Sequence, residues 1–172
     1  GEISKEDIFL DKLLLDTPVA AIKASQSEII RAAGIAREMV TIVMESLYKN
    51  ESDKFEKVEN DEETLNKLQQ DITSYTVDLS KRTLVGKQPE MIPAIINSIN
   101  HLERVGDHVG SLVDRSKTKI DRTLYFSDAA IQSLKELEAT IMEMFSKSTQ
   151  AIQENDATIV SQVFELEEKV DE

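Results

Sequence analysis

Apolar residues recur at spacings of three, four and seven over most of this 172-residue sequence. Such spacing places them along one stripe of an α-helix, whereas a half-buried strand would alternate with a period of two. Only five glycines and three prolines interrupt the pattern, which leaves little of the turn chemistry that a sandwich or barrel needs. The sequence therefore predicts an all-α fold of long helices joined by few loops.

The spacing predicts about five long helices. The first begins at Thr17, ahead of a proline, and its hydroxyl is expected to cap the helix. Ser52 with Asp53, and later Ser127, are expected to cap the second and fourth helices in the same way. Residues 117–126 carry no sustained period and are expected to form a connector. The expected helices are about 18–49, 54–86, 90–116, 127–154 and 155–172.

An internal repeat is the most informative feature of the chain. Met39–Asn66 aligns without a gap with Met144–Asp171, and the matched residue classes persist through the turn between two helices. Two helices of similar length can also align by chance, which is the alternative. If the repeat is real, each unit is expected to be a three-helix up-down bundle. Residues 17–118 would form the first unit, 127–172 the first two helices of an incomplete second unit, and 1–16 a leading linker.

The net charge of the chain limits the kinds of partner that it is expected to bind. Lys and Arg number 20 against 33 Asp and Glu, a net charge of −13, so no nucleic-acid partner is expected. The acidic excess suits hard cations or a basic partner surface, although solvated acidic faces are also common. The absence of cysteine excludes disulfides and thiolate zinc sites. The sequence shows no window of about 18 apolar residues and no apolar leader, so neither a membrane span nor a secretion signal is expected.

The stretch Glu103-Arg104-Val105-Gly106-Asp107-His108 is the first candidate site. Glu103 and Asp107 lie four residues apart, so they stand one turn above the other on a helix, at the border of its apolar stripe. Gly106 falls inside that stripe, where the absence of a side chain lets a neighbouring helix approach closely. An acidic pair beside an apolar face requires a counter-charge.

A second acidic ladder lies on the preceding helix. Glu62 precedes Asn66 by four residues, and the repeat pairs them with Glu167 and Asp171. Antiparallel helices could bring two such ladders together, and converging carboxylates would hold cations such as Mg²⁺, Mn²⁺ or iron.

The alternative for these acidic residues is that they only form ion pairs. Arg104, Arg82 or lysines on adjacent helices would then neutralise them. His101 and His108 are seven residues apart and could be ligands, but a hydrogen-bonded surface pair is the favoured interpretation. No Glu-x-x-His motif, nucleophile–base pair or phosphate-cradling glycine loop is present, so an enzyme is not expected.

The stretch 103–108, preceded by Ile99 and Leu102, resembles the E-R-I-G-D-H motif on the third helix of PhoU repeats. The resemblance implies three-helix up-down bundles in tandem, with metal clusters held by acidic ladders on the second and third helices. Carried over, the ligands are Glu103 with Asp107, and Glu167 with Asp171, supported by Arg104, Gly106 and His108. Glu62 would take part in the first repeat, where Asn66 replaces the expected Asp and weakens the set. Iron, manganese, zinc or magnesium would be the metal.

The opening segment Phe9–Pro18, followed by Ala20, Ala21 and Ile22, is similar to the segment that joins bacterial sodium/phosphate cotransporters to their PhoU-like tail. This resemblance implies a cytoplasmic domain at the inner face of the membrane that regulates phosphate uptake. Its partner would be the transporter portion of the same or another protein.

Three alternatives remain open. The first is a stand-alone PhoU-type regulator of phosphate uptake signalling. The second is a structural bundle that forms a homodimer through an apolar groove. The third, a metal-dependent hydrolase, is disfavoured because no base or nucleophile is evident.

Overall fold

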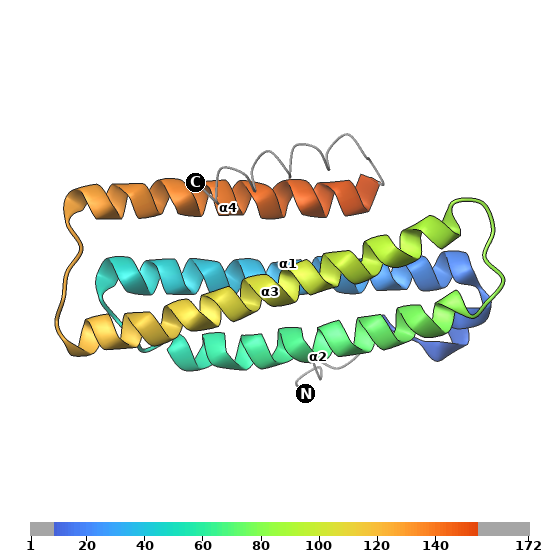
Figure 1. The fold of residues 1–172 in the computed structure, drawn as a ribbon, viewed down its shortest axis with the longest axis horizontal. Helices are drawn as coiled ribbons and strands as arrows, with labels where there is room; N and C mark the ends of the chain where they lie inside the picture. The colour runs from blue at the N-terminus through green and yellow to red at the C-terminus, as the bar shows by residue number, and fades with distance from the viewer. Residues whose placement is uncertain (1–8, 155–172) are drawn as a thin grey trace, which may run out of the picture.

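The structure is a computed structural model, and it describes residues 9–154 of the chain. Within them no strand occurs, so the all-α prediction is confirmed. Residues 155–172, with the fifth predicted helix and the candidate ligands Glu167 and Asp171, lie outside the described residues. The incomplete second bundle therefore stays a prediction. The elements are the 3₁₀ helix η1 (Lys12–Asp16) and the helices α1 (Pro18–Lys49), α2 (Phe55–Ser80), α3 (Gln88–Asp121) and α4 (Asp128–Glu154) (Figure 1).

Helices α1, α2 and α3 form an up-down bundle in which each helix contacts the other two (Figure 1). Helix α4 runs alongside this bundle and packs against α1 alone among the described helices. The molecule therefore consists of a three-helix body, α1–α3, and a fourth helix attached along one seam.

Helix α1 is buried on nearly every side because it contacts all three other helices. Ala21, Ala32 and Ala36 are fully buried, and such small side chains allow close helix packing. Glu28 is also fully buried, and its charge is met by Arg31 at 2.7 Å. The largest fully buried apolar side chains of the body are Ile29, Met39, Val43, Phe55, Val58, Leu65, Ile72, Leu79, Ile99 and Val113.

Two helix boundaries differ from the expected ones. Helix α2 ends at Ser80 rather than near Gly86, and α3 continues to Asp121 through half of the expected connector. The extension of α3 is fixed by contacts distant in sequence, since Lys117 pairs with Glu59 and Lys119 donates a hydrogen bond to Asn50 Oδ1 at 2.6 Å. Sequence periodicity carries no information about such contacts.

The capping predictions are partly wrong. Ser127 Oγ accepts from the Ala130 N–H at 3.2 Å, as expected. Thr17 makes no side-chain cap, and α2 begins at Phe55, so neither Ser52 nor Asp53 caps it through a side chain. The carbonyl of Ser52 accepts the first N–H of α2 instead. A suitable residue type ahead of a helix permits a cap, but the local backbone angles decide whether it forms.

The leading segment is more than a linker where it is described. Asp11 Oδ1 accepts from the Leu13 N–H at 2.8 Å and so caps η1. Leu15 is buried, and the hydroxyl of Tyr75 on α2 donates to the Asp11 carbonyl at 2.9 Å. Arg82 also pairs with Asp16 at 3.0 Å. The segment therefore folds back onto the body at the end where α1 begins and α2 ends.

Candidate functional site

The candidate site is the acidic seam, the line of contact between α2 and α3 that carries Glu62, Glu103 and Asp107. Glu62 projects from α2, and Glu103 and Asp107 project from α3. The Glu62 carboxylate lies directly against the α3 backbone at Gly110, where a Cβ atom would collide with it. The structure therefore brings the α2 candidate across to the α3 helix, as antiparallel packing predicts.

Two glycines one turn apart make this approach possible. A Cβ atom at Gly106 would lie 3.0 Å from Leu65 Cδ1, so the prediction that this glycine permits a close helix approach is confirmed. Gly110 does the same for Glu62, three residues before Leu65 on α2. Gly110 was not predicted, although the Gly-x-x-x-Gly spacing on α3 is a signal that could have found it.

The electrostatic environment of Glu62 is strongly negative. Partial burial raises its pKa, and the charges of Asp107, Asp114, Glu59 and Glu103 raise it further. Asp114 lies one turn beyond Gly110 and was not predicted; its spacing of seven from Asp107 is the signal for it. Glu62 therefore faces a row of acidic side chains.

The pKa of Glu103 is raised as well. Partial burial is the largest cause, followed by the hydrogen bond to Asp107 and by the charge of that side chain. The charge of Arg104 opposes the shift. A raised pKa in both Glu62 and Glu103 means that the seam disfavours its full negative charge.

Of the counter-charges expected for the seam, the structure places Arg104 near enough to Glu103 for its charge to act to lower the pKa of that carboxyl, without an ion pair between them. Within the described part of the chain, no lysine or arginine forms an ion pair with Glu62, Glu103 or Asp107. Arg82, one of the expected partners, pairs with Asp16 instead. In the described residues, Glu62 and Asp107 therefore have no ion-pair partner, and Glu103 has only the nearby charge of Arg104.

The side chains of the seam offer the type of donor atom, oxygen, that a hard cation prefers. The acidic side chains offer carboxylate oxygens, and Asn66 adds an Oδ1 atom that is buried without a hydrogen-bond partner. In residues 9–154, however, no group of three or more His, Asp or Glu side chains is arranged to hold a metal ion. The seam thus provides suitable atoms on two helices without a completed coordination shell.

The two histidines do not form the expected pair. His101 and His108 are both exposed, and neither imidazole side chain makes a hydrogen bond to the described residues. Two full turns of helix, about 10 Å, separate them, which is beyond hydrogen-bond reach. His108 stands next to Asp107 in sequence and projects into solvent.

An apolar groove lies on another side of the molecule, between the last turns of α1 and α3 and the first turns of α4. Its volume is about 570 Å³. Leu124 and Tyr125, in the connector to α4, are its most exposed apolar side chains. The remaining lining residues are Leu47, Leu112, Arg115, Ser116, Lys119, Phe126 and Leu134.

Among the described helices, none is both long enough and apolar enough to cross a bilayer.

Comparison with protein families identifies one domain in the chain. The PhoU domain matches residues 29–116, slightly more than half of the sequence. The matched range begins within α1, includes all of α2 and ends within α3, so it contains the whole acidic seam. Comparison with curated proteins and with solved structures gave no match. The chain belongs to the PhoU domain family.

Proposed function

We propose that this chain is a non-catalytic regulatory domain of a sodium-dependent phosphate transporter and that it binds metal at the α2–α3 seam. Membership of the PhoU family supports a role in the regulation of phosphate transport generally. The attachment to a sodium/phosphate cotransporter rests on the resemblance of Phe9–Pro18 to the joining segment of those proteins.

One observation carries the metal proposal. Glu62 on α2 faces Glu103 and Asp107 on α3, and none of the three has an ion-pair partner. Partial burial is the largest cause of the raised pKa of Glu62 and Glu103, and repulsion from the neighbouring carboxylates adds to it. A cation would remove this repulsion, and the metals expected are magnesium, manganese, iron or zinc.

The regulatory mechanism follows from the placement of these side chains. A bound cation would supply the positive charge that the seam lacks, with Glu103 and Asp107 as ligands from α3 and Glu62 from α2. Asn66 Oδ1 is a weaker, neutral donor on the same helix as Glu62. Because the ligands belong to different helices, occupancy would couple α2 to α3 and fix the surface that they offer to the transporter.

The metal proposal is tested by elemental analysis of protein purified without a metal-affinity tag. We expect stoichiometric metal in the parent and loss of it in the Glu103→Gln/Asp107→Asn double variant. The matched control, Glu136→Gln/Glu143→Gln, removes the same charge from exposed positions of α4 and should retain the metal. Equal metal content in all three proteins, or none in any, would overturn the proposal.

The transport role is tested by phosphate uptake in cells that produce the full protein containing this chain. We expect the Glu103→Gln/Asp107→Asn variant to change sodium-dependent uptake by at least about twofold, since a regulatory effect is typically a coupling of 1–3 kcal/mol. Replacing sodium with potassium separates the two regulatory alternatives. A change confined to sodium-independent uptake would instead support a stand-alone regulator of phosphate import.

The apolar groove favours a second candidate, an oligomerising bundle. Leu124 and Tyr125 expose 54% and 74% of their surface beside it, and a second copy of the chain could cover them. Sedimentation of the chain with and without a chelator distinguishes the two roles. A dimer that persists in the chelator and is lost in Leu124→Ser would support this candidate, whereas a monomer would exclude it.

A further inference from the structure

One end of the body differs in charge from the rest of the molecule. There η1 and the start of α1 lie beside the loop that joins α2 to α3 (Figure 1). We call this region, residues 11–23 and 78–90, the η1 end. It contains five basic and four acidic residues, a net charge of +1 in a chain of −13.

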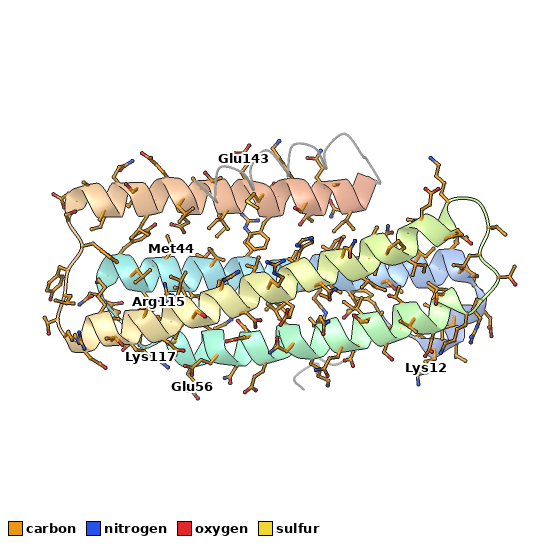
Figure 2. The ribbon with its side chains drawn as sticks, viewed as in Figure 1. Lys12, Met44, Glu56, Arg115, Lys117 and Glu143 are labelled. Atoms are coloured by element: carbon orange, nitrogen blue, oxygen red, sulfur yellow. The ribbon has the colours of Figure 1, made fainter. Side chains whose placement is uncertain are left out.

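The acidic residues of the η1 end are already engaged, apart from Glu90. Asp16 pairs with Arg82, and Asp78 pairs with Lys81 at 2.8 Å. Asp11 accepts a backbone hydrogen bond, as described above. Three lysines of this region form no ion pair in the described part of the chain. They are Lys12, Lys23 and Lys87. Figure 2 shows one of them, Lys12, at the edge of the bundle.

The same end presents three of the most exposed apolar side chains of the described residues. Leu13, Val19 and Val85 expose 84%, 68% and 64% of their surface. They lie on separate segments, namely η1, the first turn of α1 and the α2–α3 loop. The η1 end therefore presents exposed apolar side chains on three segments, together with three lysines that form no ion pair.

The backbone holds these apolar side chains in place. Leu13 lies in η1, which is capped by Asp11 and anchored by the buried Leu15. The Val85 N–H donates to Gln88 Oε1 at 2.9 Å, and Gly86 turns the loop with a φ of 58°, a value that favours glycine. Their exposure is therefore a property of ordered backbone.

We infer that the η1 end rests on an anionic membrane surface, with Leu13, Val19 and Val85 entering the interfacial layer and the three lysines without an ion pair contacting lipid phosphates. Peripheral proteins combine these two contributions, apolar insertion and attraction of Lys or Arg to acidic headgroups. The inference rests on the proposed function in one respect. If the domain follows a transporter, the chain enters it from the membrane through Phe9–Thr17, which lies at this end.

The acidic body does not prevent this contact. Glu103 lies 15 residues beyond Gln88 along α3, which corresponds to about 22 Å of helix. The Debye length at physiological ionic strength is about 8 Å, so repulsion between the acidic seam and the lipid surface is largely screened. The basic loop and the acidic seam can therefore act independently.

Fluorescence can test the inference directly, because the chain contains no tryptophan. Leu13→Trp places a probe at the η1 end, and Tyr125→Trp places a matched probe at the opposite end of the body, where the replaced residue is 74% exposed. Both proteins would be mixed, in a chelator, with vesicles of phosphatidylcholine alone or with added phosphatidylglycerol. We expect a blue shift and co-sedimentation for Leu13→Trp with the anionic vesicles only, and neither for Tyr125→Trp.

A second step identifies the contacts. Adding Lys12→Gln and Lys87→Gln to Leu13→Trp should weaken vesicle binding by about tenfold or more, given the usual contribution of each basic residue. Unchanged far-ultraviolet circular dichroism would show that the variant is folded. The inference is wrong if the anionic vesicles shift neither probe, if both probes shift equally, or if the lysine changes leave binding intact.

The same experiment distinguishes membrane contact from contact with a second copy of the chain. A blue shift of Leu13→Trp that grows with protein concentration in the absence of vesicles would assign the η1 end to contact with a second copy, and would overturn the membrane inference. The test uses no sodium gradient, phosphate or metal. Its failure would therefore leave the proposed regulatory function standing, and failure of the metal test would not alter the vesicle result.

Discussion

The three-helix body and α4 share the same kind of amphipathic sequence but are held very differently. In the body each helix contacts two others, and side chains such as Leu65, Ile72 and Ile99 are completely buried. Within the described part of α4, only Phe145 is buried, with 7% of its surface exposed, and the other core-facing side chains of the helix are only partly covered. Apolar periodicity therefore predicts that a helix has a buried face, while the number of neighbours decides how completely that face is covered.

The polar contacts of α4 with the body, like its apolar ones, are made with α1 in the described residues. The hydroxyl of Tyr48 on α1 donates to Glu138 Oε2 at 2.7 Å. Partial burial raises the pKa of Tyr48, and this hydrogen bond raises it further. The ammonium of Lys135 lies 5.7 Å from the centre of the same ring. These contacts all belong to the α1–α4 seam, so α4 has no second line of attachment among the described helices. We expect α4 to detach without unfolding the body.

The largest expected effect comes from the centre of the body. Ile72→Ala removes a fully buried side chain of α2 that packs in the shared core, and we expect a loss of about 3–4 kcal/mol in the free energy of unfolding. Urea unfolding followed by circular dichroism measures it. Because α4 depends on α1, the whole helical signal should be lost in one earlier transition. A loss below about 1 kcal/mol would show that the body is less tightly packed than its burial indicates.

A smaller and more local effect is expected at the α4 seam. Phe145→Ala should cost about 2–3 kcal/mol, below the full range for a buried aromatic residue because the single seam can partly close over the gap. Amide hydrogen exchange should show lost protection in 128–154 and retained protection in α2 and α3. Leu137→Ala, at a position 36% exposed on the same helix, is the matched control and should change little. Equal loss of protection in all four helices would mean that α4 is an integral part of the body.

The sequence predicted the helices well where local pattern decides, and less well where distant contacts do. The range of α1 follows from a proline at its start and an unbroken apolar stripe, and the structure has it at Pro18–Lys49. The end of α3 depends on Lys117 and Lys119 reaching Glu59 and Asn50 in another part of the chain. The local sequence pattern gives no indication of these long-range contacts.

The candidate site shows the same limit. The spacing of Glu103 and Asp107 places them on one face of a helix from sequence alone. Which residues face them depends on the rotation of α2 about its axis, and this rotation is set where Leu65 packs against Gly106. The spacing of Gly110 from Gly106 and of Asp114 from Asp107 places them on the same side of α3, but only that rotation brings Glu62 opposite them.

The smallest expected effect concerns the acidic seam, where like charges face one another across a closely packed pair of helices. A pKa raised above the ordinary glutamate value of 4.5 means that the folded state binds the proton more tightly than the unfolded state. Glu62 and Glu103 therefore favour folding fully below pH 4.5, and this contribution is lost as the pH rises through their raised pKa values. The lowered pKa values of Glu45 and Asp78 act in the opposite sense and at lower pH, so the two effects occur in separate windows.

Glu62→Gln isolates this contribution. At pH 7 in a chelator, the substitution removes a charge that its neighbours repel, and we expect a gain of roughly 0.5 kcal/mol in the free energy of unfolding. The rise in stability between pH 7 and pH 4.5 should become shallower, because the folded state no longer takes up that proton. Glu136→Gln, on the exposed face of α4, lacks these acidic neighbours and should leave the pH dependence unchanged. A loss of stability at pH 7 in Glu62→Gln, with chelator present, would mean that the protein alone already neutralises Glu62 and that repulsion at the α2–α3 seam does not weaken the body.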